Sequence, residues 1–159
     1  MKHVFAFLLT LLLGSFSWAA AQDFQYQGFG FRVGISEGPD QGYGGIHWDF
    51  GTPNSSLRIR PNIEIGFGDD TTLLAFNGEV DWYFRKQGDW FPYAGGAVAL
   101  NFIERDDLPP QADDTNTEVG FYAVGGIETL LMNNRKFLVE VKIGFDDSPD
   151  FKLGVGWTF

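Results

Sequence analysis

The chain has no cysteine, and after its first 21 residues it has no long hydrophobic run. The lack of cysteine in a chain that begins like an exported protein argues against a small secreted scaffold held together by disulfides. A membrane-spanning helix needs about 20 consecutive apolar residues, and no segment after residue 21 provides them. Apolar spacing of the helical type, with a period of 3.6 residues, is also missing. The composition instead favours strands, with 21 glycines and 17% aromatic residues.

Basic residues are scarce as well. The chain has 11 Lys and Arg against 21 Asp and Glu, which gives a formal net charge of -10. An acidic surface disfavours nucleic acid as a partner, because the phosphate backbone repels it. The mean hydropathy of -0.10 is near zero. This value is compatible with a soluble protein or with a membrane β-barrel, whose apolar residues are spread over alternating strands.

The amino-terminal 21 residues have the pattern of a secretory signal. Lys2 gives a positive start, Val4 to Leu13 forms a short apolar run, and Ala19 and Ala21 provide a small-residue cleavage site. A run of ten residues is too short to anchor the chain across a bilayer. We therefore expect a signal peptide over residues 1–21 and one domain over residues 22–159.

The last nine residues show the strand pattern most clearly. Phe151, Leu153, Val155, Trp157 and Phe159 alternate with polar or small residues, which places them on one face of a strand. Pro61 interrupts an otherwise regular strand and predicts a bulge there, because proline cannot donate to a ladder. The same alternation predicts eight strands, at about 24–35, 44–50, 57–67, 72–85, 91–103, 118–131, 137–145 and 151–159.

The segments between these strands alternate in length and charge. Short turns at 52–56, 86–89 and 132–136 would lie at one end of a barrel, and longer acidic loops at 36–43, 68–71, 104–117 and 146–150 at the other. This asymmetry is typical of an outer-membrane topology. Aromatic residues gather at the short-turn end and predict an interfacial girdle. Its main members are Trp48, Trp82, Trp90, Tyr93 and Trp157.

The polar face of the strands carries charges together with many glycines. Small residues suit the crowded interior of an eight-stranded barrel, so we expect the charges to point inward and the aliphatic residues outward. The predicted fold is therefore all-β, an eight-stranded antiparallel up-and-down transmembrane β-barrel with a packed polar lumen. Arg58 and Arg60 are expected to face Glu79 and Asp81 on the next strand. The full predicted lumen network is Arg58, Arg60, Glu64, Glu79, Asp81, Glu128, Glu140 and Lys142.

The chain resembles the small OmpA/OmpX-like eight-stranded outer-membrane barrels. The resemblance rests on the signal peptide, the strand pattern, the segments 92–101 (PYAGGAVALN) and 125–128 (GGIE), and the aromatic terminus. It implies an outer-membrane location, membrane lipid as the surroundings, and a terminal strand recognised by the barrel-assembly machinery. The assembly signal would consist of Leu153, Val155, Trp157 and Phe159. Members of this family include adhesion, stress, porin-like and lipid-modifying proteins.

The family's lipid A enzymes suggest what catalytic residues would look like here. The deacylase type uses a His-x-Ser pair with a carboxylate, whereas the single histidine after residue 21, His47, is followed by Trp48 and Asp49. The palmitoyltransferase type uses His, Asp and Ser in the outer loops, where His47 could pair with a loop serine such as Ser36. We expect instead that His47 is a lumen or rim residue hydrogen-bonded to Asp49.

The acidic loops are candidate ligands for divalent cations, since carboxylate oxygens suit Ca²⁺ and Mg²⁺. No segment has the spacing of an EF-hand loop, so a solvated loop tip is the preferred interpretation. The sequence predicts no cofactor. We expect a monomeric, non-enzymatic integral outer-membrane protein with a structural or surface-interaction role. A narrow porin-like channel, a lipid-modifying enzyme and a soluble periplasmic ligand-binding barrel remain the alternatives.

Overall fold

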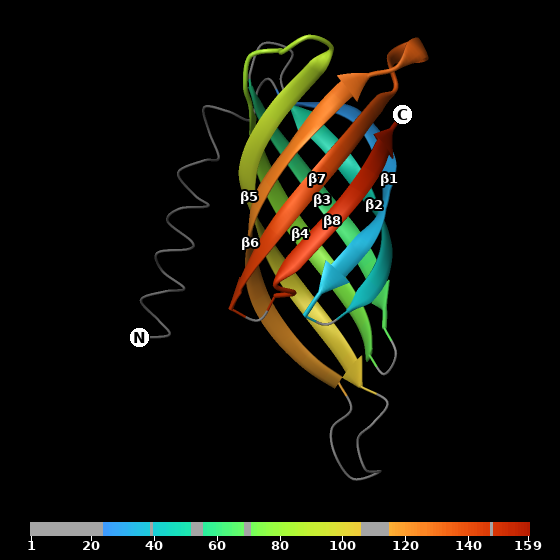
Figure 1. Cartoon of the computed structure of the whole chain (residues 1–159), viewed down its shortest axis with the longest axis vertical. Coiled ribbons are helices and arrows are strands. Elements are labelled where there is room, and N and C mark those ends of the chain that lie inside the picture. The colour runs from blue at the N-terminus through green and yellow to red at the C-terminus, as the bar shows by residue number, and fades with distance from the viewer. Residues whose placement is uncertain (1–23, 39, 52–55, 69–70, 106–114, 147) are drawn as a thin grey trace.

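The eight predicted strands form one closed antiparallel barrel (Figure 1). The computed structural model describes residues 24–38, 40–51, 56–68, 71–105, 115–146 and 148–159. Each strand pairs with its neighbours in sequence, and the last strand pairs with the first. The strands are β1 (Gln25–Glu37), β2 (Gln41–Gly51), β3 (Leu57–Phe67), β4 (Thr71–Tyr83), β5 (Trp90–Arg105), β6 (Thr115–Leu130), β7 (Lys136–Asp146) and β8 (Phe151–Thr158), with a 3₁₀ turn η1 (Met132–Asn134) between β6 and β7.

The prediction of an all-β, eight-stranded antiparallel barrel is confirmed. The largest differences in strand bounds lie at the loop end, where β2 and β6 each begin three residues before the predicted start. These extensions are polar or glycine-rich and lack the apolar alternation on which the prediction depended. They are strands because the neighbouring strand continues past them and pairs with their backbone, as between Gly42 and Phe67.

The two faces of the strands have opposite composition. On β8 the odd-numbered residues point away from the lumen, and Lys152, Gly154, Gly156 and Thr158 are buried inside it. The other strands follow the same alternation, so that the outer surface is apolar. Its exposed residues include Phe29, Phe31, Val33, Ile35, Ile65, Phe67, Phe76, Val80, Val98, Leu100, Val119, Ile127, Ile143, Phe145 and Leu153.

Pro61 does not produce the predicted bulge, and that prediction is wrong. The pairing of β2 with β3 has the same register on both sides of it, from His47 opposite Asn62 to Phe50 opposite Ile59. Proline removes one backbone donor without adding a residue, so the ladder is interrupted but not shifted. A register shift lies instead between Tyr26 and Gly28 on β1, where Gly28 has a φ of 141° that favours glycine.

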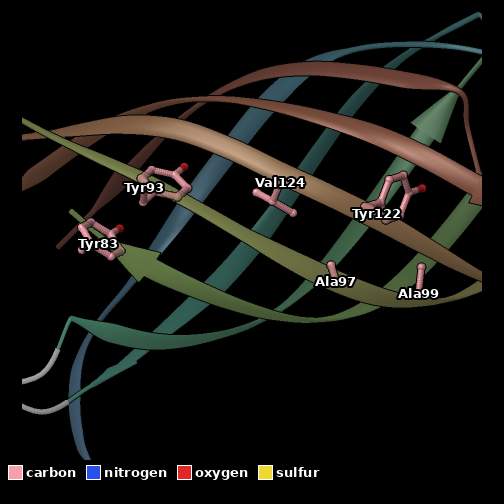
Figure 2. Close-up of a cluster of buried hydrophobic side chains, with 6 residues drawn as sticks. All are labelled: Tyr83, Tyr93, Ala97, Ala99, Tyr122 and Val124. Atoms are coloured by element: carbon pink, nitrogen blue, oxygen red, sulfur yellow. The ribbon is translucent and has the colours of Figure 1, made fainter.

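The interior contains a small apolar cluster among polar groups. Tyr83 from β4 stacks on Tyr93 from β5, with ring centroids 5.0 Å apart and planes 20° apart. Figure 2 shows that these rings and Tyr122 lie on the inner side of β4, β5 and β6, next to Ala97, Ala99 and Val124. The small alanines on β5 leave space for the rings. Within the described ranges, no helix is long and apolar enough to cross a membrane.

A candidate functional site in the barrel lumen

Eight charged side chains meet in the middle of the lumen, and we call them the central charge cluster. Four are cations and four are anions, and each is at most 3% exposed. They come from five strands, because inward positions recur at every second residue on each strand. The cluster consists of Arg32 (β1), Arg60 and Glu64 (β3), Glu79 and Asp81 (β4), Glu140 and Lys142 (β7), and Lys152 (β8).

The two arginines each contact several carboxylates. Arg32 Nη1 lies 3.1 Å from Glu140, 3.4 Å from Glu79 and 3.5 Å from Glu64. Arg60 Nη2 lies 2.6 Å from Asp81 Oδ2 and 3.1 Å from Glu79 Oε1. Arg60 also donates through Nε to Asp81 at 2.8 Å. Guanidinium groups suit this arrangement because they present several donors in one plane.

The two lysines join opposite walls of the barrel. Lys142 Nζ on β7 lies 2.8 Å from Glu79 Oε2 on β4 and 3.5 Å from Glu64 Oε1 on β3. Lys152 on β8 donates to the same Glu64. Strands β3 and β7 are four places apart in a ring of eight. The ion pairs between them therefore cross the lumen from one wall to the other.

Tyrosine rings flank the cluster. The Arg60 guanidinium lies 4.6 Å from the centre of the Tyr93 ring, and the Tyr93 hydroxyl donates to Glu140 at 2.8 Å. At the other end of the cluster the Lys152 ammonium lies 4.2 Å from the centre of the Tyr43 ring. The rings fill space beside the cations, whose charge is attracted to the aromatic faces.

Tyr93 was predicted at the lipid interface, and that assignment is wrong. Its side chain is 3% exposed and points into the lumen. It shares the parity of Ala97 and Ala99 on β5, which also face inward. The prediction relied on the closeness of Tyr93 to a turn and passed over this parity.

The other predicted girdle residues lie on the outer surface near the turn end. Trp82 and Trp157 are exposed, and Trp48 and Trp90 are half-buried. Trp90 and Trp157 each contact the Phe137 ring, at centroid distances of 6.4 Å and 5.3 Å. All four residues of the expected assembly signal point outward, with Val155 half-buried and Leu153, Trp157 and Phe159 exposed.

Seven of the eight predicted lumen charges are buried in the lumen, and the eighth, Arg58, is half-buried. Glu128 lies outside the central charge cluster and accepts a hydrogen bond of 2.9 Å from the Tyr83 hydroxyl. Arg58 is paired with Asp81 in the β-ladder, but its guanidinium lies over the Tyr83 ring at 5.6 Å. Asp81 is bound instead by Arg60.

The predicted network omitted Arg32 and Lys152. Both lie on the inward parity of their strands, β1 and β8, so the alternation alone was a sufficient signal to include them. Their partners are on β3, β4 and β7 and are distant in sequence. A second omitted pair is Lys136 with Asp49, at 2.5 Å near the turn end of the lumen.

His47 is fully buried on the inner face of β2. Its Nε2 lies 2.8 Å from the hydroxyl of Thr158 on β8. The expected hydrogen bond to Asp49 is not formed: among the described residues His47 Nδ1 has no hydrogen-bond partner, and Asp49 binds Lys136 through Oδ2. Ser36, the other residue considered for catalysis, lies near the loop end of β1.

The loop end carries the acidic segments. Asp69, Asp70, Asp106, Asp107, Asp113, Asp114 and Asp147 lie outside the described residues. Among the residues that are described, no group of three or more His, Asp or Glu is arranged to hold a metal ion. A cavity of about 720 Å³ opens at this end and is lined by Ile35, Ser36, Glu37, Asp40, Gln41, Gly42, Phe67, Gly68 and Phe151.

Comparison with known proteins gives structural similarity but no sequence family. No protein-family model matches the sequence, and no curated protein matches it. Neisserial surface protein A (NspA) has a similar structure, with a TM-score of 0.65 and 14% identity, covering 85% of this chain and 95% of that one. The outer-membrane enzyme PagL has a TM-score of 0.51 and 13% identity, covering 82% and 97%. A de novo designed protein, TMB2.3, has a TM-score of 0.50 and 13% identity, covering 89% and 95%.

This chain has the fold of the small eight-stranded outer-membrane barrels. A surface protein and an enzyme are both among the similar structures, so the fold leaves the activity open. The function therefore depends on the residues in the lumen and on the outer face.

Proposed function

We propose that the chain is an integral outer-membrane β-barrel that catalyses no reaction and whose lumen is closed by its own charged side chains. Its role would then be structural or at the cell surface. The observation that carries the proposal is the central charge cluster, whose ion pairs join β3 and β4 to β7 across the lumen. The fold is compatible with this role, since NspA is a surface protein.

The balance of charges supports a closed lumen. The central charge cluster contains four cations and four anions, whereas the whole chain has a net charge of -10. Removing a charge from water costs several kcal/mol unless a partner compensates it. An ion path would normally leave charges facing water, but each of these eight contacts at least one opposite charge.

Conductance in a planar bilayer tests the closed lumen against the narrow porin-like channel. We expect no steady channels from the wild-type protein. The variant Glu79→Gln removes one anion from the cluster, and Asp89→Asn removes an anion from an exposed turn as a control. Steady wild-type channels whose conductance changes in Glu79→Gln but not in Asp89→Asn would overturn the proposal.

The outer face supports a location in the outer membrane with lipid as its main partner. Apolar side chains cover the barrel wall, and tryptophans lie towards the turn end. A soluble ligand-binding barrel would need the reverse arrangement, with an apolar interior. Membrane fractionation and heat-modifiable migration on gels test this point. Recovery of a folded barrel in the periplasmic fraction without detergent would contradict it.

Assembly is part of the same proposal. The outward residues of β8 would be the segment through which the barrel-assembly machinery inserts a monomer. Crosslinking from Val155 during biogenesis would detect that contact. Insertion that proceeds normally when Trp157 and Phe159 are both replaced by alanine would remove this part of the proposal.

The position of His47 supports a non-enzymatic role. Its ring is fully buried and bonded to Thr158, on the face opposite to the lipid-facing surface. A lipid A profile tests the enzyme alternative in cells with the gene, without it, and with His47→Gln. We expect the three profiles to agree. An acyl-chain difference between the first two that His47→Gln abolishes would establish the enzyme instead.

The exposed charges of the two ends indicate the orientation. The loop end carries Glu37 and Asp150, whereas the turn end carries three cations, Arg85, Lys86 and Arg135, and one anion, Asp89. We place the acidic end outside the cell. Because the chain has no cysteine, single variants can be labelled cleanly on intact cells with an impermeant maleimide. Glu37→Cys should react and Lys86→Cys should not, and the opposite result would invert the orientation.

A further inference from the structure

The closing strand β8 is bound by side chains that do not come from its neighbours. It is the shortest of the eight strands, with 8 residues, and its backbone pairs only with β1 and β7. Two inward positions on β8, Thr158 and Gly154, are nevertheless covered by His47 and Tyr43 from β2. These side chains must cross the whole width of β1 to reach it.

The crossings follow the register of the sheet. Gly30 on β1 is paired with His47 on one side and with Thr158 on the other. Four residues further along β1, and past the inward Arg32, Gly34 is paired with Tyr43 and with Gly154. Each long side chain therefore lies above the glycine of β1 that separates it from β8.

Glycine at these positions leaves the space that the crossings need. A Cβ atom on Gly30 would lie 2.0 Å from the Trp157 carbonyl oxygen of β8 and 2.6 Å from Cε1 and Nε2 of His47. One on Gly34 would lie 2.2 Å from the Leu153 carbonyl oxygen and 2.7 Å from Cε1 of Tyr43. All of these distances are too short for non-bonded atoms in contact. A Cβ on Gly154 would collide with the Tyr43 hydroxyl in the same way. The inner face of β1 thus has a gap at each of these two glycines, with Arg32 between them, and we call the two gaps that hold His47 and Tyr43 the glycine trough.

We infer that His47 and Tyr43, lying in the glycine trough of β1, form a latch that holds β8 against β1 once the barrel has closed. The buried His47–Thr158 hydrogen bond is its polar part, and the Tyr43 ring over Gly154 is its packing part. Lys152 at the loop end of β8 adds a contact to Tyr43 and an ion pair to Glu64. Without the latch, the β1–β8 seam is where the barrel opens first.

Amide hydrogen exchange of the folded mature barrel in detergent measures this opening strand by strand. Thr158→Val removes the hydroxyl but keeps the shape of the side chain. We expect exchange of the β8 amides to become about tenfold faster, the effect of losing one buried hydrogen bond, while amides between β4 and β5 keep their rate. Thr158→Ser retains the hydroxyl and should exchange like the wild type.

Three further variants make the result specific. Asn77→Leu removes a buried hydrogen bond of the same length, 2.8 Å, between β4 and β3 and should not accelerate β8 selectively. Tyr43→Leu removes the packing part and should also accelerate exchange at the seam, even if Thr158→Val fails to fold. His47→Leu combined with Thr158→Val should have no more effect than either change alone.

The inference is overturned if Thr158→Val and Tyr43→Leu leave β8 exchange unchanged. It is equally overturned if they accelerate exchange by the same factor in all strands, because the contacts would then serve overall stability only. Neither result would bear on the closed lumen or on the absence of catalysis, which the conductance and lipid A experiments test.

Discussion

Glu79 and Val80 are neighbours on β4, yet one is fully buried in the lumen and the other is 46% exposed on the outer wall. Inside the barrel, each charge of the central charge cluster contacts an opposite charge, and the hydroxyls of Tyr83 and Tyr93 donate to Glu128 and Glu140. Outside, the exposed side chains of the described strands are mostly aliphatic or aromatic, with tryptophans near the turn end. A soluble protein has the reverse order, so this difference shows that the wall of the barrel is built to face lipid.

The largest expected effect is the loss of a charge from the inside. Glu79→Gln leaves Lys142 and Arg60 with one anion fewer in a buried site, and we expect the free energy of unfolding to fall by about 3–5 kcal/mol. Urea titration of the barrel folded in lipid vesicles measures this change. Asp89→Asn alters the exposed pair with Lys86 and should leave the stability unchanged. Equal losses of stability in the two variants would show that the central charge cluster contributes no more to the free energy of unfolding than an exposed ion pair.

The next effect comes from placing a charge on the outside. Val98 is exposed in the middle of β5, and Val98→Arg would bring a guanidinium into the hydrocarbon core at a cost of about 2–4 kcal/mol. Leu131→Arg, at the turn end, should cost at most about 1 kcal/mol in the same vesicle assay. If both arginines were tolerated equally, the outer face would not lie in the membrane.

Two adjacent glycines allow the two faces to be compared with one methyl group. A Cβ on Gly126 would lie 2.5 Å from the Tyr93 ring, whereas a Cβ on Gly125 meets nothing within 4 Å. Gly126→Ala should therefore lose about 1–3 kcal/mol through overpacking. Gly125→Ala, which points outward, should change the unfolding midpoint hardly at all. A larger loss in Gly125→Ala than in Gly126→Ala would reverse the assignment of the faces on β6.

The smallest effect is expected at the rim of the barrel. Side chains there are neither enclosed in the lumen nor in the middle of the lipid-facing wall. The Arg135 guanidinium lies 5.1 Å from the centre of the Phe159 ring, and both side chains are exposed. Arg135→Gln should lower the stability by about 0.5 kcal/mol. The change in urea midpoint measures it, and a loss comparable with that of Glu79→Gln would mean that the terminal ring is anchored far more tightly than its exposure indicates.

Much of the fold could be predicted from the sequence because a strand records its two environments in alternate residues. The eight strands and the inward direction of Glu79 and Asp81 follow from that alternation. The approach of Arg60 to Glu79 was also foreseeable, since β3 and β4 are consecutive antiparallel strands and therefore neighbours in space. Pro61 and Tyr93 were misjudged because a local cue, a missing donor or a nearby turn, was given more weight than the register.

The contacts between distant strands could not be foreseen. Lys142 binds Glu79 from across the lumen, and His47 reaches Thr158 over an intervening strand. Both contacts depend on the stagger with which the barrel closes, and nothing within a single strand specifies it. The same holds for Arg32, whose three carboxylate partners lie on β3, β4 and β7.

By itself the sequence determined which residues face lipid and which face the lumen, because side chains alternate on every strand whatever its partner. It also determined the number of strands and the alternation of short turns with longer acidic loops. Only the tertiary structure decided which cation meets which anion and that His47 and Tyr43 bind the closing strand. The physical reason is that such pairings require β8 to meet β1 in one register, and that register is fixed by closure of the whole ring rather than by any local segment.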